Sequence, residues 1–267
     1  MSTRWRIQYQ QVILFERCFH ETGRGQLVDA EIIGTTLEAA EFVKYVDNTW
    51  HALKVSFGNE VGRLCKAANV DSHDVMNIFL KDTKLNISSY YLKPGFAYGG
   101  SCLPKDTRGI NHVAKTLGVE LPIIASIPAS NDSHIEHTMD IIDSQEVKKV
   151  GLVGITFKAG TDDLREAPAL ELMKRLLTKG YEVKFYDPCI TPCTMLDKDA
   201  DWNARLQACF VDSGDKLNAQ AETLVVTHAQ PYAEEIIAKS HPQMKVLDVV
   251  RMKECFETDA RYEGIGW

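Results

Sequence analysis

An unbroken helical pattern from Thr35 to Val70 is the feature that most restricts how this chain can fold. The segment contains no proline, and its apolar residues recur at spacings of mostly three and four, which is the period of an amphipathic helix. Thr35 and Glu38, three residues later, form the pattern of a capping box. A helix of roughly 35 residues is much longer than the average in globular proteins. We therefore expect this helix to pack against a second subunit.

Composition excludes several classes of protein. The net charge of −7 argues against a nucleic-acid partner, because such a partner requires a basic surface. No apolar run approaches the roughly 20 residues that span a bilayer, and the first residues lack the apolar core of a secretory signal. The seven cysteines are scattered, as in proteins of reducing compartments, and none shows the spacing of a zinc site. We expect a cytoplasmic protein that binds no membrane, no nucleic acid and no metal.

The residues on either side of the long helix have less regular patterns. Val12–Glu21 could form a short helix, and Asp71 is a good N-cap for a second helix after the long one. Residues 81–106 break the helical period with glycines, prolines and aromatic residues, and such a long loop in a compact domain is usually functional. Two further helices are expected at about 105–117 and 122–142.

The character of the sequence changes at Val147. Apolar runs at 148–155, 181–186, 223–227 and 245–250 alternate with helical segments at 168–179 and 231–239. Strands that alternate with helices predict a parallel, doubly wound sheet. The predicted fold class is therefore α/β, an all-helical domain followed by a Rossmann-like domain, with the boundary near 142–147.

Cys102 is the strongest candidate for chemistry. It lies in the segment Gly99–Asp106, Gly-Gly-Ser-Cys-Leu-Pro-Lys-Asp, in which the glycines let the backbone approach a ligand closely. A predicted helix start at Pro104 places N–H groups and the positive end of a helix dipole beside the thiol. Lys105 adds positive charge, and Asp106 could orient water or a proton. A buried structural cysteine is the common alternative, but these neighbours favour a reactive thiol in a small-molecule site.

Lys44 and Asn48 are four residues apart, so they share one face of the long helix. Glu41 and His51 lie on the same face. On spacing alone, a solvated polar stripe opposite the apolar face explains these residues better than a catalytic pair does.

The segment Phe157–Arg165 follows the first strand of the predicted sheet, and open α/β sheets bind ligands at the carboxyl ends of their strands. The preceding Gly151–Gly154 is not a Gly-x-Gly-x-x-Gly fingerprint, so a conventional NAD site is not expected there. Lys158 and Arg165 could bind phosphates, or they could be surface charges paired with nearby aspartates. Asp187 lies where a ribose-binding acid is found, although an Asp-Pro turn explains it equally well.

Several segments together resemble the UDP-glucose/GDP-mannose dehydrogenase family, the nucleotide-sugar 6-dehydrogenases. The most specific are Gly99–Asp106 and Phe157–Glu166. The others are Glu41–Asn48, Asn59–Glu60, Lys84–Phe96 and Glu263–Trp267. The resemblance covers about residues 12–267 and is strongest to the members that oxidise GDP-mannose.

The resemblance implies an NAD-dependent enzyme that oxidises the C6 alcohol of GDP-mannose to the carboxylate of GDP-mannuronate. Cys102 matches the family cysteine that adds to the aldehyde intermediate, giving a thiohemiacetal that is oxidised to a thioester and hydrolysed. Lys44 and Asn48 match residues that stabilise developing negative charge, and Asp106 matches the aspartate that assists proton transfer and activates water.

The resemblance also implies which residues bind ligands and partners. The candidates for the nucleotide sugar are Asn86, Tyr90, Tyr91, Lys93, Gly95, Phe96 and Lys158. Arg165 is the candidate for binding the phosphates of the cofactor. The long helix matches the dimer core of the family, so we expect a homodimer.

The family begins with an NAD-binding Rossmann domain, which this sequence largely lacks. We interpret residues 1–34 as a remnant of that domain, its final helix and strand. Residues 35–146 would then form the central dimerisation and catalytic-cysteine domain, and residues 147–267 the nucleotide-sugar-binding Rossmann-like domain. A separate chain could supply the NAD domain, and without it the chain is expected not to reduce NAD.

Three other functions remain open from the sequence. A non-catalytic module for nucleotide-sugar binding and dimerisation would not need a reactive Cys102, and a UDP-sugar 6-dehydrogenase fragment would differ in its nucleotide. A thiol hydrolase outside this family would need a histidine beside Cys102, and His51 and His112 are the candidates.

Overall fold

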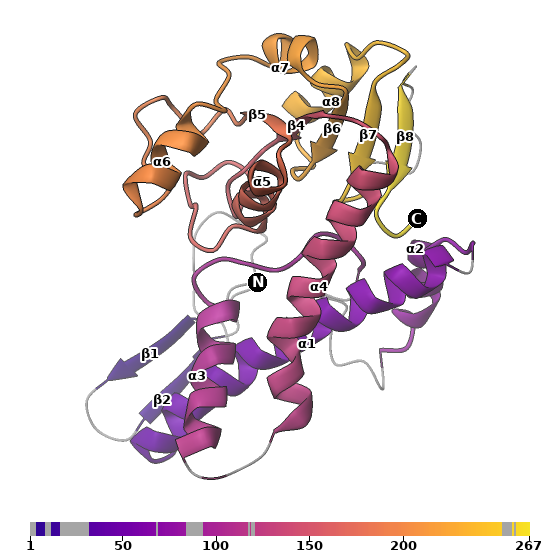
Figure 1. Cartoon of the computed structure of the whole chain (residues 1–267). Coiled ribbons are helices and arrows are strands. Elements are labelled where there is room, and N and C mark those ends of the chain that lie inside the picture. The colour runs from indigo at the N-terminus through magenta and orange to yellow at the C-terminus, as the bar shows by residue number, and fades with distance from the viewer. Residues whose placement is uncertain are drawn as a thin grey trace.

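Three structural parts follow one another along the chain in the computed structural model (Figure 1). They are a small antiparallel sheet, a group of four helices and a parallel sheet with its own helices. The structure describes residues 4–8, 12–16, 32–67, 69–83, 93–116, 118, 121–252, 258 and 260–267. Within these residues, no helix has the length and apolar character that crossing a membrane requires.

The first part differs from the prediction. Strands β1 (Arg4–Gln8), β2 (Val12–Glu16) and β3 (Ile32–Gly34) pair antiparallel in that order. The expected helix at Val12–Glu21 is therefore wrong over Val12–Glu16, and its remaining residues lie outside the described part. A short apolar run such as Val-Ile-Leu-Phe fits a strand and a buried helix equally well by its period. Pairing on both sides of β2 decides in favour of the strand.

The helical part largely follows the prediction. It contains α1 (Leu37–Ala67), α2 (Ser72–Phe79), α3 (Leu103–Thr116) and α4 (Pro122–Ser144). Helix α1 begins at Leu37, two residues after Thr35. At its start, the N–H of Ala40 donates to the carbonyl of Thr36 (3.0 Å). Asp71 caps α2 as expected by accepting the N–H of His73 (2.7 Å).

Helices α3 and α4 both pack against α1 and against each other. Gly109 on α3 makes one close approach possible, because a Cβ there would lie 3.0 Å from the ring of Tyr45 on α1. One side of α1 nevertheless carries large apolar side chains that remain exposed, namely Phe42, Val43, Val46, Trp50 and Phe57.

The last part is a five-stranded parallel sheet in the order β5-β4-β6-β7-β8. Its strands are β4 (Lys149–Val153), β5 (Glu182–Tyr186), β6 (Thr223–Val226), β7 (Lys245–Asp248) and β8 (Arg261–Gly264). Its helices are α5 (Pro168–Lys179), α6 (Ala200–Gln207), α7 (Gly214–Gln220) and α8 (Pro231–Ala238). The elements α6, α7 and β8 were not predicted, because they are too short to show a period in the sequence.

Both faces of this sheet are buried, as a doubly wound fold requires. Successive residues of a strand point to opposite faces, and Leu152 and Val153 on β4 belong to two different apolar clusters. The cluster with Leu152 includes Leu172 of α5, and the cluster with Val153 includes Leu217 of α7 and Ile236 of α8. The predicted Rossmann-like architecture is confirmed.

Two sets of contacts hold the helical part against the parallel-sheet part. On one side, Arg175 of α5 bonds to Asp132 and Glu136 of α4 as well as to Glu171 of its own helix. On the other, the C-terminus returns to α1 and α2 (Figure 1), where Lys66 contacts Glu263 (2.6 Å). These contacts fix how the end of the parallel sheet faces the Cys102 loop.

The chain terminus completes the second set of contacts. Trp267 packs edge-on against the ring of His73 with centroids 4.7 Å apart, and Arg251 pairs with Asp71 (2.9 Å). Burial, together with the positive charge of Arg251, lowers the pKa of His73 to about 4. The ring of His73 is therefore neutral at physiological pH and acts as an apolar contact for Trp267.

Candidate active site

The glycine pair before Cys102 lies against the turn that follows β4. A Cβ at Gly99 would stand 2.1 Å from the carbonyl oxygen of Glu166, and one at Gly100 would stand 2.5 Å from the ring of Phe157. Gly100 also has a φ of +82°, a region that L-residues with a side chain rarely adopt. The two glycines thus allow the loop of the helical part to touch the parallel-sheet part.

Cys102 directly precedes α3. The N–H of Asp106 donates to the carbonyl of Cys102 (2.9 Å), which makes Cys102 the residue that flanks the first turn. Its side chain is exposed, with the hydroxyl of Ser101 3.7 Å from Sγ. Exposure excludes the buried structural cysteine, and the helix N-terminus provides partial positive charge beside the sulfur.

Asp106 is the centre of a buried polar cluster, with no exposed side-chain surface. The ammonium of Lys44 lies 3.3 Å from one carboxylate oxygen, and the amide of Asn48 donates to the same oxygen. Lys105 lies 3.6 Å from the other oxygen. Lys44 and Asn48 are therefore not merely a solvated stripe, because their face of α1 turns towards α3.

The segment Phe157–Arg165 forms a closed turn. The N–H of Phe157 donates to the carbonyl of Asp163 (2.7 Å), and that of Thr161 donates to the carbonyl of Lys158 (3.2 Å). Arg165 bonds to both carboxylate oxygens of Asp163 (2.8 and 2.7 Å), which lowers the pKa of Asp163 to about 2. Asp163 therefore carries a negative charge that partly neutralises Arg165.

Arg165 also interacts electrostatically with the thiol. Its pKa is raised first by Asp163 and to a smaller extent by the charge of Cys102. The structure thus brings Arg165 and Cys102 together, although they are far apart in the sequence. Lys158 is exposed in the same turn.

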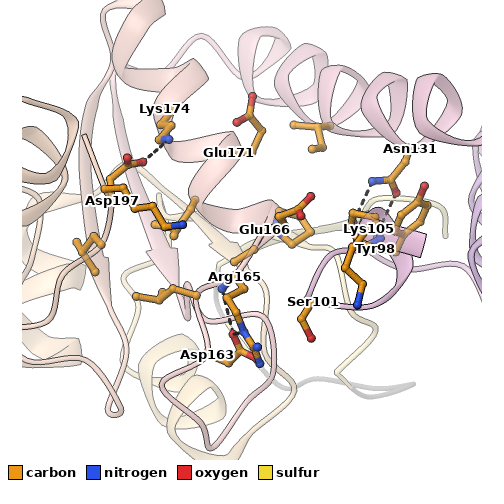
Figure 2. Close-up of a pocket in the computed structure, with 18 of the residues that line it drawn as sticks. Tyr98, Ser101, Lys105, Asn131, Asp163, Arg165, Glu166, Glu171, Lys174 and Asp197 are labelled. Carbon is orange, nitrogen blue, oxygen red and sulfur yellow. Dashed lines mark hydrogen bonds and ion pairs between the residues drawn. The ribbon is translucent and has the colours of Figure 1, made fainter. Parts of the chain in front are cut away.

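A cleft of about 1,400 Å³ lies beside this loop, between the helical and parallel-sheet parts. Ser101 and Lys105 contribute to one wall, and Arg165, Glu166 and Lys174 to the other (Figure 2), while Arg108 also lines the cleft from α3. The volume exceeds that of a typical small-molecule pocket, so an extended ligand fits. The lining residues include Ser101 and Lys105 but not Cys102, Asp106, Lys44, Asn48 or Lys158.

An ion pair that was not predicted connects the two walls of this cleft. Arg108 of α3 donates to both carboxylate oxygens of Glu166 (2.7 and 2.6 Å), and this contact raises the pKa of Arg108. The two residues are 58 positions apart, and nothing in the spacing of the sequence indicates the pair.

The loop expected to hold the nucleotide sugar is only partly described. Lys93 is exposed and Pro94 is buried, while the N–H of Gly95 donates to Asn59 Oδ1 (3.1 Å). The carbonyl of Phe96 accepts from the amide of the same asparagine (3.3 Å). The other three predicted contacts, Asn86, Tyr90 and Tyr91, lie outside the described residues.

The crevice between the carboxyl ends of β4 and β6, where such sheets often bind nucleotides, is filled by the chain itself. Asp187 accepts the N–H groups of Ile155 (2.9 Å) and Thr156 (3.2 Å). His228 Nε2 donates to the carbonyl of Thr156 (2.8 Å), and its Nδ1 lies 2.8 Å from the hydroxyl of Tyr232. A Cβ at Gly154 would stand 2.5 Å from the ring of His228. The carboxylate of Asp187 thus binds the backbone at the start of the turn that contains Lys158, and not a ribose. The position of His228 in this crevice was not predicted from the sequence.

Among the described residues, no group of histidine, cysteine, aspartate and glutamate side chains is arranged to hold a metal ion. The described part of the site offers an exposed thiol at Cys102, the buried carboxylate of Asp106 with its donors Lys44 and Asn48, and positively charged side chains on the cleft.

Two family profiles match the chain. Residues 38–133 match the central domain of the UDP-glucose/GDP-mannose dehydrogenase family, and residues 151–259 match its UDP binding domain. The GDP-mannose 6-dehydrogenase of Pseudomonas aeruginosa is 39% identical over 244 residues, which are 90% of this chain and 56% of the relative. The chain thus spans little more than half the length of this curated relative.

Solved structures agree with these matches. A ternary complex of GDP-mannose dehydrogenase from Pseudomonas aeruginosa superposes with a TM-score of 0.60 at 39% identity, covering 87% of this chain and 54% of that one. A UDP-glucose dehydrogenase from Pyrobaculum islandicum gives a TM-score of 0.72 at 31% identity, covering 86% of this chain and 51% of that one.

Proposed function

The chain belongs to the UDP-glucose/GDP-mannose dehydrogenase family, and we propose that it is the substrate-binding and catalytic-cysteine portion of an NAD-dependent GDP-mannose 6-dehydrogenase. The observation that carries the proposal is the exposed thiol of Cys102 at the start of α3, one helical turn before the buried Asp106 with its partners Lys44 and Asn48. We keep the proposed division into a central domain at 35–146 and a nucleotide-sugar-binding domain at 147–267.

Cys102 acts as the nucleophile. Its sulfur adds to the C6 aldehyde of the sugar, so that an S–C6 bond forms and the carbonyl electron pair moves to oxygen. The ammonium of Lys44 and the amide of Asn48 are preorganised by the buried Asp106. Fixed donors of this kind stabilise an oxyanion more than the ground-state carbonyl, which lowers the barrier.

Oxidation of the thiohemiacetal removes a hydride from C6 and a proton from its oxygen, leaving a thioester on Cys102. Water then attacks C6, the C6–S bond breaks and the thiolate is released with the carboxylate product. Asp106, linked to Lys44, is the group through which we expect two protons to be moved, that of the thiohemiacetal hydroxyl and one from the attacking water.

NAD⁺ would accept the hydride in each of the two oxidations. The chain fits this cofactor only in part, because the crevice of its parallel sheet is filled by Asp187 and His228. Arg165, on the wall of the cleft beside the thiol, is the residue that suits a cofactor phosphate. Its pairing with Asp163 leaves the guanidinium largely exposed and able to bind a second anion.

GDP-mannose is proposed as the nucleotide sugar because a relative of that activity matches nearly the whole chain. The matched C-terminal profile is described as UDP binding, so UDP sugars are the alternative to test. Lys93 and Lys158 are the exposed cations proposed to bind the diphosphate.

Calorimetric titration of the chain with GDP-mannose and with UDP-glucose tests this proposal. We expect GDP-mannose to bind about ten-fold more tightly or better, and Lys158→Ala to weaken binding about ten-fold through the loss of one charge-assisted hydrogen bond. Lys239→Ala is the control, since Lys239 is an exposed lysine of similar kind that pairs with Asp215 (3.1 Å) away from the site. Tighter binding of UDP-glucose, or no binding of either sugar, contradicts the proposal.

A homodimer through α1 is the second part of the proposal. Val46 and Trp50 remain 55% and 44% exposed on α1, and large apolar side chains gathered on one helix face are typical of an interface. Sedimentation equilibrium should give twice the chain mass of 30.0 kDa, with Val46→Glu and Trp50→Glu monomeric. Ile123→Glu, at a still more exposed apolar site on α4, should remain dimeric, and a monomeric parent chain would refute the interface.

A further inference from the structure

Residues 93–102 run between the proposed sugar-binding loop and the thiol without forming a helix or strand. Backbone N–H and C=O groups in such a segment need partners when they are buried, and Ala97, Tyr98, Gly99 and Gly100 are all buried. The hydrogen-bond partners of these backbone groups therefore determine the position of Cys102.

Two asparagines supply these partners. Asn59 of α1 accepts the N–H of Gly95 (3.1 Å) and donates to the carbonyl of Phe96 (3.3 Å). Asn131 of α4 accepts the N–H of Tyr98 (2.8 Å) and donates to its carbonyl (2.9 Å), as Figure 2 shows. Asn131 thus bonds to both backbone groups of one residue, as a neighbouring β-strand would, while Asn59 connects the N–H of one residue with the carbonyl of the next.

A third contact strengthens the first of these. His134 Nε2 lies 2.7 Å from the carbonyl oxygen of Gly95, and its Nδ1 lies 2.8 Å from the guanidinium of Arg63. Because arginine can only donate, Nδ1 accepts and Nε2 carries the proton that is donated to Gly95. Burial, opposed in part by that bond and reinforced by Arg63, lowers the pKa of His134 to about 4, in agreement with this neutral tautomer.

An amide supplies an acceptor and a donor on separate atoms of one planar group, so it can satisfy two backbone groups at once. A carboxylate in the same place would still accept the N–H group, but it would face a carbonyl oxygen without a proton to donate. An aliphatic side chain would leave both backbone groups unpaired. The asparagines at these two positions are therefore matched to the backbone and not only to the space that they fill.

We propose that Asn59 and Asn131 are positioning residues that fix the backbone between the sugar-binding loop and Cys102, so that the thiol is held at a set place relative to the bound nucleotide sugar. Asn59 does not line the cleft, and the amide of Asn131, which does, is already bonded to both backbone groups of Tyr98. The proposal rests on the proposed function for its meaning in catalysis, while its effect on the thiol can be measured independently.

The segment is fixed from both sides. Asn59 and Asn131 hold Gly95–Tyr98 on the helical part, and the next two residues, Gly99 and Gly100, lie against the turn after β4. Cys102 follows two residues later, at the start of α3. Loss of one amide leaves a free stretch of backbone directly before the nucleophile.

Asn59→Asp and Asn131→Asp test the proposal, each as a separate variant of the full chain. The rate of Cys102 alkylation by iodoacetamide and the affinity for GDP-mannose are measured well below the unfolding midpoint. We expect GDP-mannose affinity to fall about ten-fold, the effect of one lost buried hydrogen bond. We expect Cys102 alkylation to slow roughly three-fold, the size of a helix-terminus charge effect, as the thiol leaves its fixed place.

Asn218→Asp is the matched control. Asn218 also bridges two groups with one amide, donating to the carbonyl of Ile236 (2.8 Å) and accepting from Ser240 (3.2 Å), but it does so between α7 and α8. This variant should lose stability and keep both the alkylation rate and the affinity of the parent.

The outcomes separate the two proposals. If the Asn59 and Asn131 variants lose stability yet keep the parent rate of Cys102 alkylation, their role is structural only and the positioning proposal is overturned. If the parent does not bind GDP-mannose but the variants still slow alkylation, the positioning role stands and the proposed function fails. Should one variant not fold, the other decides the matter.

Discussion

Cys102→Ser is expected to remove the covalent chemistry of the chain completely. In the parent, iodoacetamide at neutral pH should label Cys102 before any other described cysteine, and an aldehyde analogue of the nucleotide sugar should form a reversible adduct there. Serine has nearly the same shape but is a far weaker nucleophile without an activating base. Both signals should disappear, while GDP-mannose binding should change little.

Cys193 is the natural comparison for this experiment. Cys102 and Cys193 are the two exposed thiols among the described residues. Cys102 lies at the N-terminus of α3, whereas Cys193 lies in a turn before α6. We expect Cys102 to react about five-fold faster than Cys193, the size of one helix-terminus charge effect on the attacking sulfur.

Peptide mass spectrometry over a time course measures both rates, with Cys193→Ser as the control variant. Equal rates at Cys102 and Cys193, together with no aldehyde adduct, would favour the non-catalytic binding module over an enzyme portion. Hydrolytic activity that survives the substitution of both His51 and His112 would exclude the thiol hydrolase, since these are the histidines proposed for it.

The parts of the fold that could be predicted are those with a clear local pattern. Helix α1 repeats its apolar residues along 31 positions, and the strands β4 to β7 are rich in apolar residues. The ends of α5 are fixed by Pro168 and Gly180, with Gly180 in the left-handed conformation at φ +90°. Helix α7 and strand β8 are short and mostly polar, so they show no such pattern. They exist because of their tertiary contacts, which the local sequence does not encode.

The candidate site divides in the same way. The Cys102 loop could be recognised because the glycines, the thiol and the helix start are neighbours in the chain. The contact of Lys44 and Asn48 with Asp106 could not be recognised from the spacing of residues along α1, which alone favoured a solvated stripe. Asp106 is 58 or more positions away from them in the sequence. The same applies to His228, which fills a crevice formed only when β4 and β6 pair.

Asn59 falls between these cases. It was part of a recognised segment, but no chemistry followed from its place on the helix. Its partners are backbone groups of Gly95 and Phe96, and backbone groups leave no mark in a sequence. Hydrogen bonds between a side chain and backbone groups distant in the sequence can be identified only from the three-dimensional structure.

Gly100→Ala is expected to lower the free energy of unfolding by about 3 kcal/mol. A left-handed conformation costs an alanine about 1 kcal/mol or more, and overpacking adds a further contribution of about 1–3 kcal/mol. The overpacking arises because the new Cβ would lie 2.5 Å from the ring of Phe157. Since the strain falls two residues before Cys102, the alkylation rate of the thiol should change as well.

Gly180→Ala separates the two contributions. Gly180 has a similar φ of +90°, but no atom lies within 4 Å of the position that a Cβ would take, so only the conformational cost of about 1 kcal/mol is expected. Phe157→Ala in the Gly100→Ala background removes the ring that the new Cβ would meet, a ring that is 39% exposed. This double variant should therefore regain the part of the free energy of unfolding that overpacking had removed. Urea unfolding of the four variants, with Phe157→Ala alone as the fourth, measures each contribution. Equal losses for Gly100→Ala and Gly180→Ala would mean that the loop does not rest on Phe157, and the contact that joins the thiol to the parallel-sheet part would have to be sought elsewhere.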